Sequence, residues 1–589
     1  MTEEKESKGL NGENSLNTSK KGGRIMSTDE KEQKRITRRE FVKGAAVGAA
    51  GVAAAGVLAS CAQEATPCPT PSPCPPAPTA APCPVPWLPE KWDKEADVVV
   101  VGFGGAGGAA ALEAHDAGAK VIILEKTPTP GGATTLCCGV IYAAGTSVQK
   151  AEGITDTADE MYKYWMAMGK GLCDPELVRA VADQSGDTVE WLKKMGAVFY
   201  SGVGTPGVIG PWGLYYSGAE ADPEFTALTP AKVRGHNVRP ATPTWPYPPQ
   251  FPPETPLTGG GGGTNPGETY RNGTGFFKCL YEGAKARGIE VLSETPAIAL
   301  IADPVTKQVL GVRAQSKGTT LFIKATRAVV LATSGFTWNQ QMLKLHNVDH
   351  GATIVPNSSS TPADVGEGIQ MAMAIGADVA NMDQGTTYGG PTPGAIFVNG
   401  GGRRFVDETI YGMYLAEVMR GQRGAVVYSI FDEDIRKEVG LTGTIQAPTI
   451  RELAVKIGID PISQLGIDPA VLEDTVNTYN GYVQSGKDLE FGRTTKRHHA
   501  EPIPMVPIIT PPFHALKVLP MVVLTQGGLR INSKAQVIDV SGNVIPRLYA
   551  AGLCSGGFIG DMYPGSGSAI CTALNTGRIA GKNAGIEKL

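Results

Sequence analysis

Two short apolar runs, joined by a glycine-rich turn and an alanine-rich stretch, mark the start of the folded part of the chain. Val98 to Val101 and Val121 to Leu124 are wholly aliphatic. Uninterrupted aliphatic runs of this length are typical of strands buried in a parallel sheet. The alanine-rich stretch between them has the composition of a helix. The pattern therefore predicts strand, helix and second strand, the βαβ unit of an α/β fold.

The turn between the first strand and the helix has glycines at the spacing that a dinucleotide requires. Gly102 allows a tight turn, Gly104 lets the backbone approach a pyrophosphate, and Gly107 lets the helix pack closely on the strand. The free N–H groups at the start of the helix favour phosphate. Glu125, at the end of the second strand, can bind a ribose hydroxyl. A glycine-rich turn of another α/β protein is the alternative, but the order and spacing of all these parts predict dinucleotide binding.

The remaining pattern alternates between strands and helices, except in one long internal segment. It predicts these elements in chain order: helical residues 157–196, a helix over 276–288, a strand over 289–292, a hairpin of 309–312 with 321–324, an apolar strand over 328–333, and a last helix ending at Gly585. Residues 384–515 have helices, loops and scattered charge, and we interpret them as an inserted cap domain. The nucleotide domain is then predicted over 93–383 and 516–589. Within it, residues 201–264 are rich in Gly, Pro, Trp and Tyr, which indicates either a lid over an apolar ligand or an irregular surface loop.

Export signals, rather than a folded domain, occupy residues 1–61. The polar first 36 residues are typical of disorder, and Thr37 to Lys43 resembles a twin-arginine export signal. The apolar segment 44–58 is shorter than a membrane helix, which needs about 20 residues. Leu58 to Cys61 resembles a lipoprotein processing site, so Cys61 is expected to become a lipidated N-terminus; ordinary cleavage nearby is the alternative. We expect a protein exported in folded form to the periplasm or cell surface.

Residues 62–92 form a proline-rich tether, because proline at every second or third position favours extended polyproline II. Cys68, Cys74 and Cys83 lie in it without the spacing of a metal site, and their pairing stays open. No CxxCH motif is present, so no c-type haem is expected, and we predict no metal site. The net charge of −4, with 19% charged residues, argues against nucleic acid as a partner.

A set of motifs in fixed order resembles one family of flavoproteins. The set comprises the glycine turn with Glu125, Gly131-Gly132, VVLATSGF at 329–336, RRFVDE at 403–408, TQGG at 525–528, LYAAG at 548–552 and YPGSGSAICTALNTGRIAG at 563–581. Over residues 95–585 the chain resembles the fumarate reductases and 3-ketosteroid dehydrogenases. The resemblance implies an α/β fold, with a glutathione-reductase-like (Rossmann-type) FAD-binding domain, an inserted α+β cap, and an active site at the flavin between them.

The same resemblance implies FAD as the cofactor and assigns its contacts to residues of these motifs. They are Gly102, Gly104, Gly105, Ala106, Gly107, Glu125, Lys126, Gly131, Gly132, Ala133, Thr134, Ala297, Thr333, Gly335, Gly552, Ser566, Ser568 and Ala569. Gly565, Ser566 and Gly567 would open the final helix, whose N-terminus would face the edge of the flavin that becomes negative on reduction.

Two positions decide between the branches of this family. Fumarate reductases hold a dianion with histidines and arginines; one such histidine directly precedes the TxGG motif, where this chain has Leu524. Their proton-donor arginine lies four residues after the glutamate of the RFxxE motif, where this chain has Gly412. Without these cations a dicarboxylate would be bound poorly. The sequence therefore favours the ketosteroid branch over fumarate.

Tyr563 to Gly567 matches the Tyr-x-x-x-Gly motif of that branch. The resemblance implies that the Tyr563 hydroxyl and the Gly567 N–H form an oxyanion hole for a substrate carbonyl, in which one donor is worth about 3–4 kcal/mol. A second tyrosine would transfer the proton. Tyr411 is the first candidate because it follows Glu408, and Tyr414 is the second. Tyr142 is a candidate for a further wall of the site.

We thus expect an FAD-dependent oxidoreductase that adds or removes hydrogen next to a carbonyl of an apolar substrate, most simply a 3-ketosteroid or similar cyclic enone. The enzyme would exchange electrons with a separate carrier, either quinone-linked or a cytochrome. A lipid anchor would be the only link between the enzyme and a membrane. A reductase of an unsaturated carboxylate, such as urocanate or an aryl acrylate, is the alternative. A flavin-binding electron-transfer or sensor module is the non-catalytic alternative.

Overall fold

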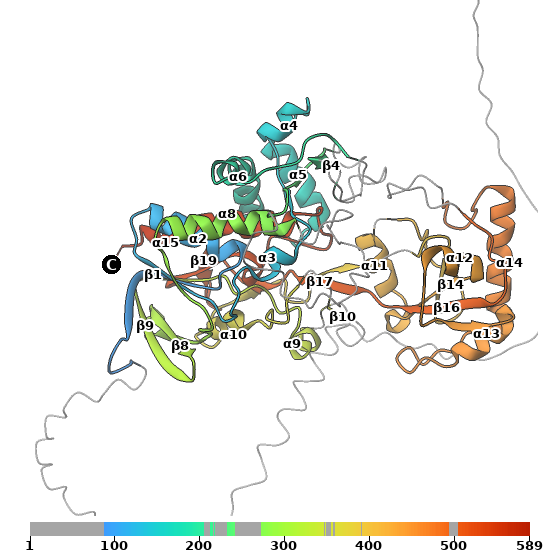
Figure 1. The fold of residues 1–589 in the computed structure, drawn as a ribbon. Coiled ribbons are helices and arrows are strands. Elements are labelled where there is room, and N and C mark those ends of the chain that lie inside the picture. The colour runs from blue at the N-terminus through green and yellow to red at the C-terminus, as the bar shows by residue number, and fades with distance from the viewer. Residues whose placement is uncertain are drawn as a thin grey trace, which may run out of the picture. The chain divides into compact units, whose positions relative to one another are not determined.

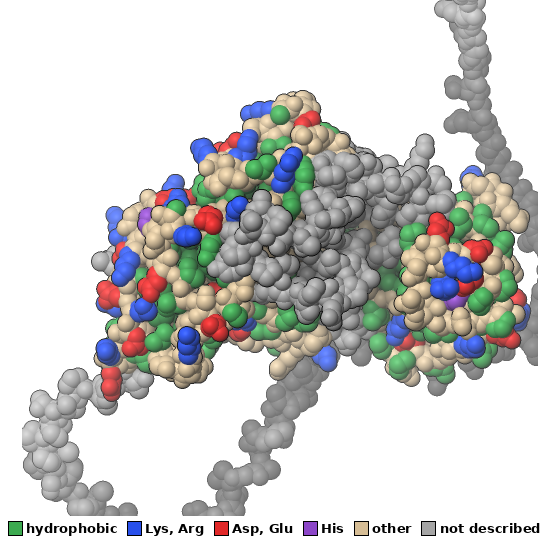
Figure 2. Space-filling model, in the orientation of Figure 1, with side chains coloured by type: hydrophobic (Ala, Val, Ile, Leu, Met, Phe, Trp, Pro, Cys, Tyr) green, Lys and Arg blue, Asp and Glu red, His purple; other side chains and the backbone are tan. Residues whose placement is uncertain are grey.

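The computed structural model describes residues 88–204, 213–215, 217, 232–241, 272–346, 348, 355–356, 360–389, 392–410, 412–493 and 505–588 (Figure 1). Most of the chain from Pro84 onward belongs to one compact unit. Its described surface carries acidic and basic side chains interspersed with one another on the face that Figure 2 shows, as the small net charge leads one to expect. Among the described residues, no helix has the length and apolar character that a membrane span requires.

A mainly parallel sheet is the centre of the first and last parts of this unit. Its strands follow the order β19-β20-β9-β1-β2-β6, and the β7–β8 hairpin joins it through β9. Their bounds are β1 Lys94–Val101, β2 Val121–Leu124, β6 Glu290–Leu292, β7 Ala297–Ala302, β8 Val309–Ser316, β9 Thr319–Leu331, β19 Gln536–Ile538 and β20 Val544–Ala550. The aliphatic ends of β1 and β2 are buried, because the sheet is covered on both faces. The predicted βαβ unit is confirmed: β1 and β2 are parallel neighbours, with Val98 opposite Val121.

Three helices pack next to one another beside this sheet: α2 (Gly105–Asp116), α8 (Gly273–Ala286) and α15 (Ser568–Gly585) (Figure 1). The contact between α15 and α2 depends on glycines four residues apart. A Cβ on Gly577 or Gly581 would collide with the backbone of α2 at Ala106 or Ala110. Residues four apart share one face of a helix, so these glycines form a groove that lets the two backbones approach closely.

Two predicted elements were wrong in extent. The predicted strand over 328–333 is the end of β9, which runs unbroken from Thr319. Polar residues continue the strand between the two apolar parts: Thr326 donates to the Asp97 carboxylate on the neighbouring strand at 2.7 Å. The predicted helical segment 157–196 is two helices, α5 (Ala158–Gly169) and α6 (Pro175–Lys194). Asp174 starts the second by accepting hydrogen bonds from two N–H groups of its first turn.

A small sheet, β3 (Val140–Tyr142), β5 (Gly235–Asn237) and β4 (Leu214–Tyr215), packs near α5 and α6. Two strands of this small sheet, β4 and β5, come from residues 201–264, the segment for which a lid or an irregular surface loop was predicted. Tyr215 is buried there. The other aromatic residues expected to cover a ligand lie outside the described residues: Trp212, Tyr216, Trp245 and Tyr247.

The segment predicted as a cap has its own sheet and its own apolar core. The sheet has the order β13-β14-β16-β15, from Ile396–Asn399, Val427–Phe431, Phe513–Val518 and Ile445–Ala447. Its helices are α11 Gly412–Arg420, α12 Glu433–Val439, α13 Ile450–Ile457 and α14 Pro469–Ser485. Next to this sheet, β12 (Gly385–Tyr388) pairs antiparallel with β17 (Met521–Thr525), so that Thr386 lies opposite Leu524. A third strand, β10 (Val355–Pro356), pairs with β17 on its other side. The chain therefore enters and leaves the inserted segment through two paired strands, β12 and β17.

Candidate active site

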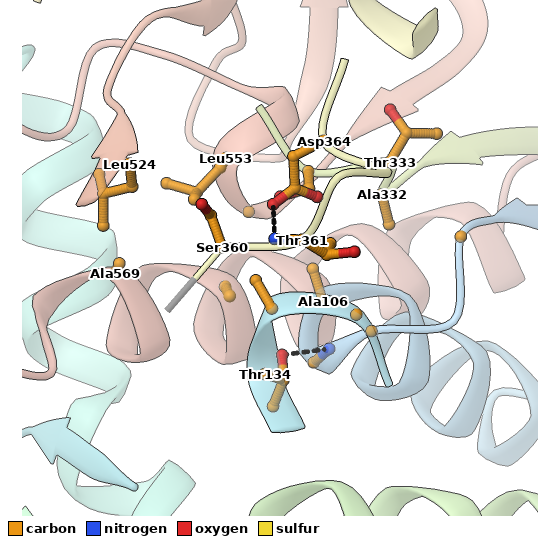
Figure 3. Close-up of a pocket in the computed structure, with 18 of the residues that line it drawn as sticks. Ala106, Thr134, Ala332, Thr333, Ser360, Thr361, Asp364, Leu524, Leu553 and Ala569 are labelled. Atoms are coloured by element: carbon orange, nitrogen blue, oxygen red, sulfur yellow. Dashed lines mark hydrogen bonds between the residues drawn. The ribbon is translucent and has the colours of Figure 1, made fainter. Parts of the chain in front are cut away.

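One cavity of about 460 Å³ extends along the glycine turn and the N-terminus of α15. Figure 3 shows ten of its lining residues with labels, among them Ala106 and Thr134 near the turn and Leu524 and Ala569 toward its other end. The walls come from the ends of β1, β2, β9 and β17, the starts of α2 and α15, and residues 360–371. The cavity thus lies at the carboxyl ends of the parallel strands, where ligands of α/β folds bind.

The glycine turn has the shape of a phosphate cradle. Gly102 has a positive φ of 101°, and a Cβ on Gly107 would collide with the Gly102 carbonyl. A Cβ on Gly104 would instead lie 3.7 Å from the nearest other protein atom, so the space beside this residue is the cavity itself. Among the described residues, none accepts a hydrogen bond from the N–H of Gly104 or of Ala106. Two N–H donors without an acceptor, at a helix N-terminus, fit a pyrophosphate.

Glu125 is fixed at the end of β2 with its carboxylate on the cavity wall. One oxygen accepts from the Phe103 N–H at 3.0 Å, and the other from the N–H and hydroxyl of Thr127 at 2.8 and 2.7 Å. A carboxylate oxygen can accept more than one hydrogen bond, so Glu125 can also bind a ribose hydroxyl. The adjacent Lys126 donates to Glu367 at 2.5 Å. These residues fit the adenosine half of FAD.

Sequence reasoning missed the segment 360–371, which forms one side of the cavity. Asp364 is 4% exposed and accepts from the Thr361 N–H at 3.2 Å (Figure 3). Burial raises its pKa to about 7, a shift that the negative charge of Glu367 favours and the positive charge of Lys126 opposes. A signal was present in the sequence: an acidic residue and two glycines, Gly366-Glu367-Gly368, open helix α10 (Glu367–Met373).

Replacing Asp364 by asparagine is expected to stabilise the FAD-depleted protein at pH 8 but not at pH 4. The carboxyl has a raised pKa in the fold, so the unfolded state binds fewer protons than the folded state between pH 4 and pH 7, and stability falls as pH rises through this window. At about 1.4 kcal/mol for each pH unit, the loss is at most about 4 kcal/mol. Asparagine does not titrate. Thermal unfolding of both proteins at pH 4 to 8 measures the difference, and parallel pH profiles would contradict the assignment.

Most of the predicted FAD contacts line the cavity. They are Gly102, Gly104, Gly105, Ala106, Glu125, Lys126, Gly132, Ala133, Thr134, Ala297, Thr333, Gly552, Ser566 and Ala569. The other four are Gly107, Gly131, Gly335 and Ser568, which do not appear on its wall. These four shape the wall from behind. For example, a Cβ on Gly335 would collide with the Thr525 hydroxyl, and the Ser568 hydroxyl donates to the Gly565 carbonyl at 2.8 Å.

The opposite end of the cavity brings Tyr563 and Gly567 together at the start of α15. Tyr563 is 8% exposed, and its hydroxyl oxygen accepts from the Ala569 N–H at 2.7 Å. The hydroxyl hydrogen therefore remains available to a ligand. Burial raises the pKa of Tyr563, while the hydrogen bond from Ala569 lowers it, so the side chain is a neutral donor at physiological pH. Among the described residues, none accepts from the Gly567 N–H.

Apolar residues, together with Thr386, line the wall at the Tyr563 end of the cavity. Leu524 and Gly412, the positions at which the fumarate reductases carry cations, both line the cavity, with Val523 and Met413 next to them. Of the described residues on the cavity wall, Lys126 is the sole cation, and it is paired with Glu367. Cys137 and Cys138 also line the cavity; both are partly buried, and the Cys137 thiol donates to the Thr134 carbonyl at 3.1 Å.

Of the other candidate tyrosines, the two that the structure describes do not line this wall. Tyr411 lies outside the described residues. Tyr414, in α11, is partly buried against apolar residues and does not line the cavity, although Gly412 and Met413 do. Tyr142 is fully buried, with its ring edge-on to Trp165 at a centroid distance of 5.9 Å, and it also does not line the cavity.

Comparisons with known proteins agree with this geometry. Residues 97–570 match the family described as FAD binding domain. Fumarate reductase (cytochrome) of Shewanella frigidimarina is 33% identical over 511 residues, which covers 83% of this chain and 76% of that protein. Digoxin reductase of Eggerthella lenta is 27% identical over 598 residues, covering 93% of this chain and 96% of that protein.

Among solved structures, 3-ketosteroid-Δ4-(5α)-dehydrogenase from Rhodococcus jostii RHA1 has a TM-score of 0.66 and 30% identity. The match covers 84% of this chain and 98% of that one. FAD requires three features that this cavity has: a cradle of N–H donors, a fixed acidic residue, here Glu125, and a helix N-terminus at the far end, here that of α15. The chain therefore belongs to the FAD binding domain family and is an FAD-dependent oxidoreductase of the fumarate reductase and 3-ketosteroid dehydrogenase type.

Proposed function

We propose that the protein adds or removes hydrogen across a carbon–carbon bond next to the carbonyl of a 3-ketosteroid or a similar cyclic enone. One observation carries the proposal: two hydrogen-bond donors, the Tyr563 hydroxyl and the Gly567 N–H, lie on a cavity wall that also carries the apolar residues Val523, Leu524 and Met413. A neutral ketone needs donors at its oxygen and apolar walls around its carbon skeleton. The likeness to the Rhodococcus ketosteroid dehydrogenase supports the same substrate class.

The roles of the residues follow from the charge that develops in such a reaction. Bound FAD supplies hydride transfer to or from the substrate carbon. As the neighbouring carbon becomes enolate-like, the carbonyl oxygen gains negative charge, and Tyr563 and Gly567 donate to it. The Ala569 N–H polarises the Tyr563 hydroxyl from behind, at 2.7 Å. Each donor is preorganised by α15, so it stabilises the transition state by about 3–4 kcal/mol.

A second side chain must transfer the proton that is added to or removed from the substrate together with the hydride. We propose Tyr411 for this role, with Tyr414 as the alternative, because both directly adjoin in sequence the pair Gly412 and Met413, which lines the cavity wall. A positioned acid or base contributes about 10²- to 10⁴-fold to the rate.

The identity to a fumarate reductase favours a second candidate, reduction of an unsaturated carboxylate. The cavity wall argues against it, because Lys126, which is paired with Glu367, is the sole cation among the described residues of the wall. Anaerobic reoxidation of the dithionite-reduced enzyme decides between the two. A 3-keto-4-ene or 1,4-diene steroid should reoxidise the flavin quickly, and fumarate, urocanate and cinnamate should not. Reoxidation by a carboxylate alone would overturn the proposal.

Replacing Leu524 by arginine is expected to reverse the preference of the cavity. An unpaired cation buried beside the substrate disfavours an apolar ketone and offers a partner to a carboxylate. We expect the apparent KM for the steroid to rise by at least about 10-fold and that for cinnamate to fall, since a charge-assisted hydrogen bond is worth about 1.5–3 kcal/mol. The rate of flavin reoxidation at graded substrate concentrations measures both. Leu524→Met, of similar volume and no charge, is the control, and equal effects of the two variants would contradict the prediction.

We further propose that a separate carrier, quinone-linked or cytochrome, exchanges electrons with the flavin outside the cytoplasm. The resemblance of Thr37 to Lys43 to a twin-arginine signal supports the location, and Cys61 is the proposed anchor. The name of the Shewanella relative indicates a cytochrome as its own electron partner.

A further inference from the structure

The segment that carries Tyr563 and Gly567 is held from behind by aromatic side chains of helix α5. The Tyr164 hydroxyl donates to the Pro564 carbonyl at 3.2 Å, directly after Tyr563 in the chain. The Trp165 indole N–H donates to the Phe558 carbonyl at 2.7 Å. Tyr164 is 1% exposed and Trp165 is fully buried, so neither can touch a substrate.

A buried ion pair stands behind Tyr164. Arg234 and Asp156 have fully buried side chains and are joined by two hydrogen bonds of 2.8 and 2.9 Å. The Arg234 guanidinium lies 5.5 Å from the centroid of the Tyr164 ring. Two bonds in a fixed fork orient a guanidinium, and the guanidinium in turn restricts the ring beneath it.

Hydrogen bonds also fix the turn on its other side. The Ser566 N–H donates to the Ser217 carbonyl at 2.7 Å, and the Ser568 N–H donates to the Gly565 carbonyl at 3.1 Å. Gly565 leaves room for the ring of Tyr142, which a Cβ at that position would contact at 2.8 Å. The turn is therefore held at several points, while the Gly567 N–H stays without an acceptor among the described residues.

We propose that Tyr164 is a positioning residue for the reaction, which holds the Tyr563–Gly567 turn in the geometry that stabilises the developing oxyanion. This inference rests on the proposed function. Oxyanion donors act only when they sit at the place where charge will develop, and a displacement of about 1 Å caused by a remote change can cost about 10²-fold in rate. Among the described residues, the Tyr164 hydroxyl links α5 directly to the residue that follows Tyr563.

Tyr164→Phe tests this in the FAD-loaded enzyme, because it keeps the ring and removes only the hydroxyl. We expect kcat for the steroid to fall about 10-fold, KM to change less than about 2-fold, and the flavin spectrum to stay as in the wild type. Tyr162→Phe is the matched control: it lies on the same helix, beneath Arg179 at 4.0 Å. It should leave kcat unchanged. A Tyr164 variant with wild-type kcat would overturn the inference.

A double-mutant cycle separates positioning from general loss of structure. If Tyr164 acts through this turn, adding Tyr164→Phe to Tyr563→Phe lowers kcat by less than the product of the two single effects. Fully multiplicative effects of the two changes would overturn the inference. Trp165→Phe removes the hydrogen bond from the indole to the Phe558 carbonyl. It tests independently whether α5 holds the segment that carries Tyr563. Failure of the proposed function is a different result, since the wild-type enzyme itself would then not react with any ketone.

Discussion

Replacing Tyr563 by phenylalanine is expected to lower kcat for a 3-ketosteroid by about 10²- to 10³-fold, with FAD still bound. The change removes the hydrogen that would be donated to the carbonyl oxygen, while the ring keeps its place in the cavity wall. Ala569 also loses the acceptor of its N–H at the start of α15, which should cost about 1 kcal/mol of stability. Steady-state kinetics, together with the visible flavin spectrum, measure the effect.

A second buried tyrosine provides the control for this prediction. Tyr549 is 1% exposed, and its hydroxyl donates to Glu587 near the C-terminus, away from the cavity lining. Tyr549→Phe is thus the same chemical change in a comparable environment, and it should leave kcat within about 2-fold of the wild type, as expected of a residue without a role in the transition state. If Tyr563→Phe were no slower than this control, the carbonyl would have to bind elsewhere.

Replacing Gly104 by valine is expected to lower the FAD content of the purified protein to less than about a tenth of the wild-type value, because the side chain would occupy the pyrophosphate position. The nearest protein atom to a Cβ there is 3.7 Å away, so the fold has room for the branch point and the cavity receives the methyl groups. Flavin absorbance relative to protein absorbance measures the loss, and circular dichroism should stay unchanged.

Gly481→Val is the control, since Gly481 lies in helix α14 with no other atom within 4 Å of its Cβ position. It should bind FAD fully. A comparable change at Gly107 would not be informative, because a Cβ there collides with the Gly102 carbonyl and would damage the fold itself. Full FAD content in Gly104→Val would contradict the assignment of the turn as the phosphate cradle.

The sequence by itself determined the nucleotide-binding unit and its cofactor. The aliphatic run of the second strand has the same bounds, Val121–Leu124, in the sequence pattern and in the structure. Glycine spacing was also readable: Gly102 and Gly107 are needed by contacts within one turn, so local sequence is sufficient to reveal them. The start of α15 after Gly567 followed from the same kind of local signal.

Only the tertiary structure decided which distant residues meet around the substrate end of the cavity. Leu524, Gly412 and Tyr563 are far apart in the chain, and the β12–β17 ribbon and the start of α11 bring them to one wall. The periodic pattern of the chain does not single out Tyr164, and the glycines at 366 and 368 indicate the segment that carries Asp364 but not the role of this residue. The role of Tyr164 arises from a hydrogen bond to a residue 400 positions away in the chain, and that of Asp364 arises from burial; both exist only once the chain is folded.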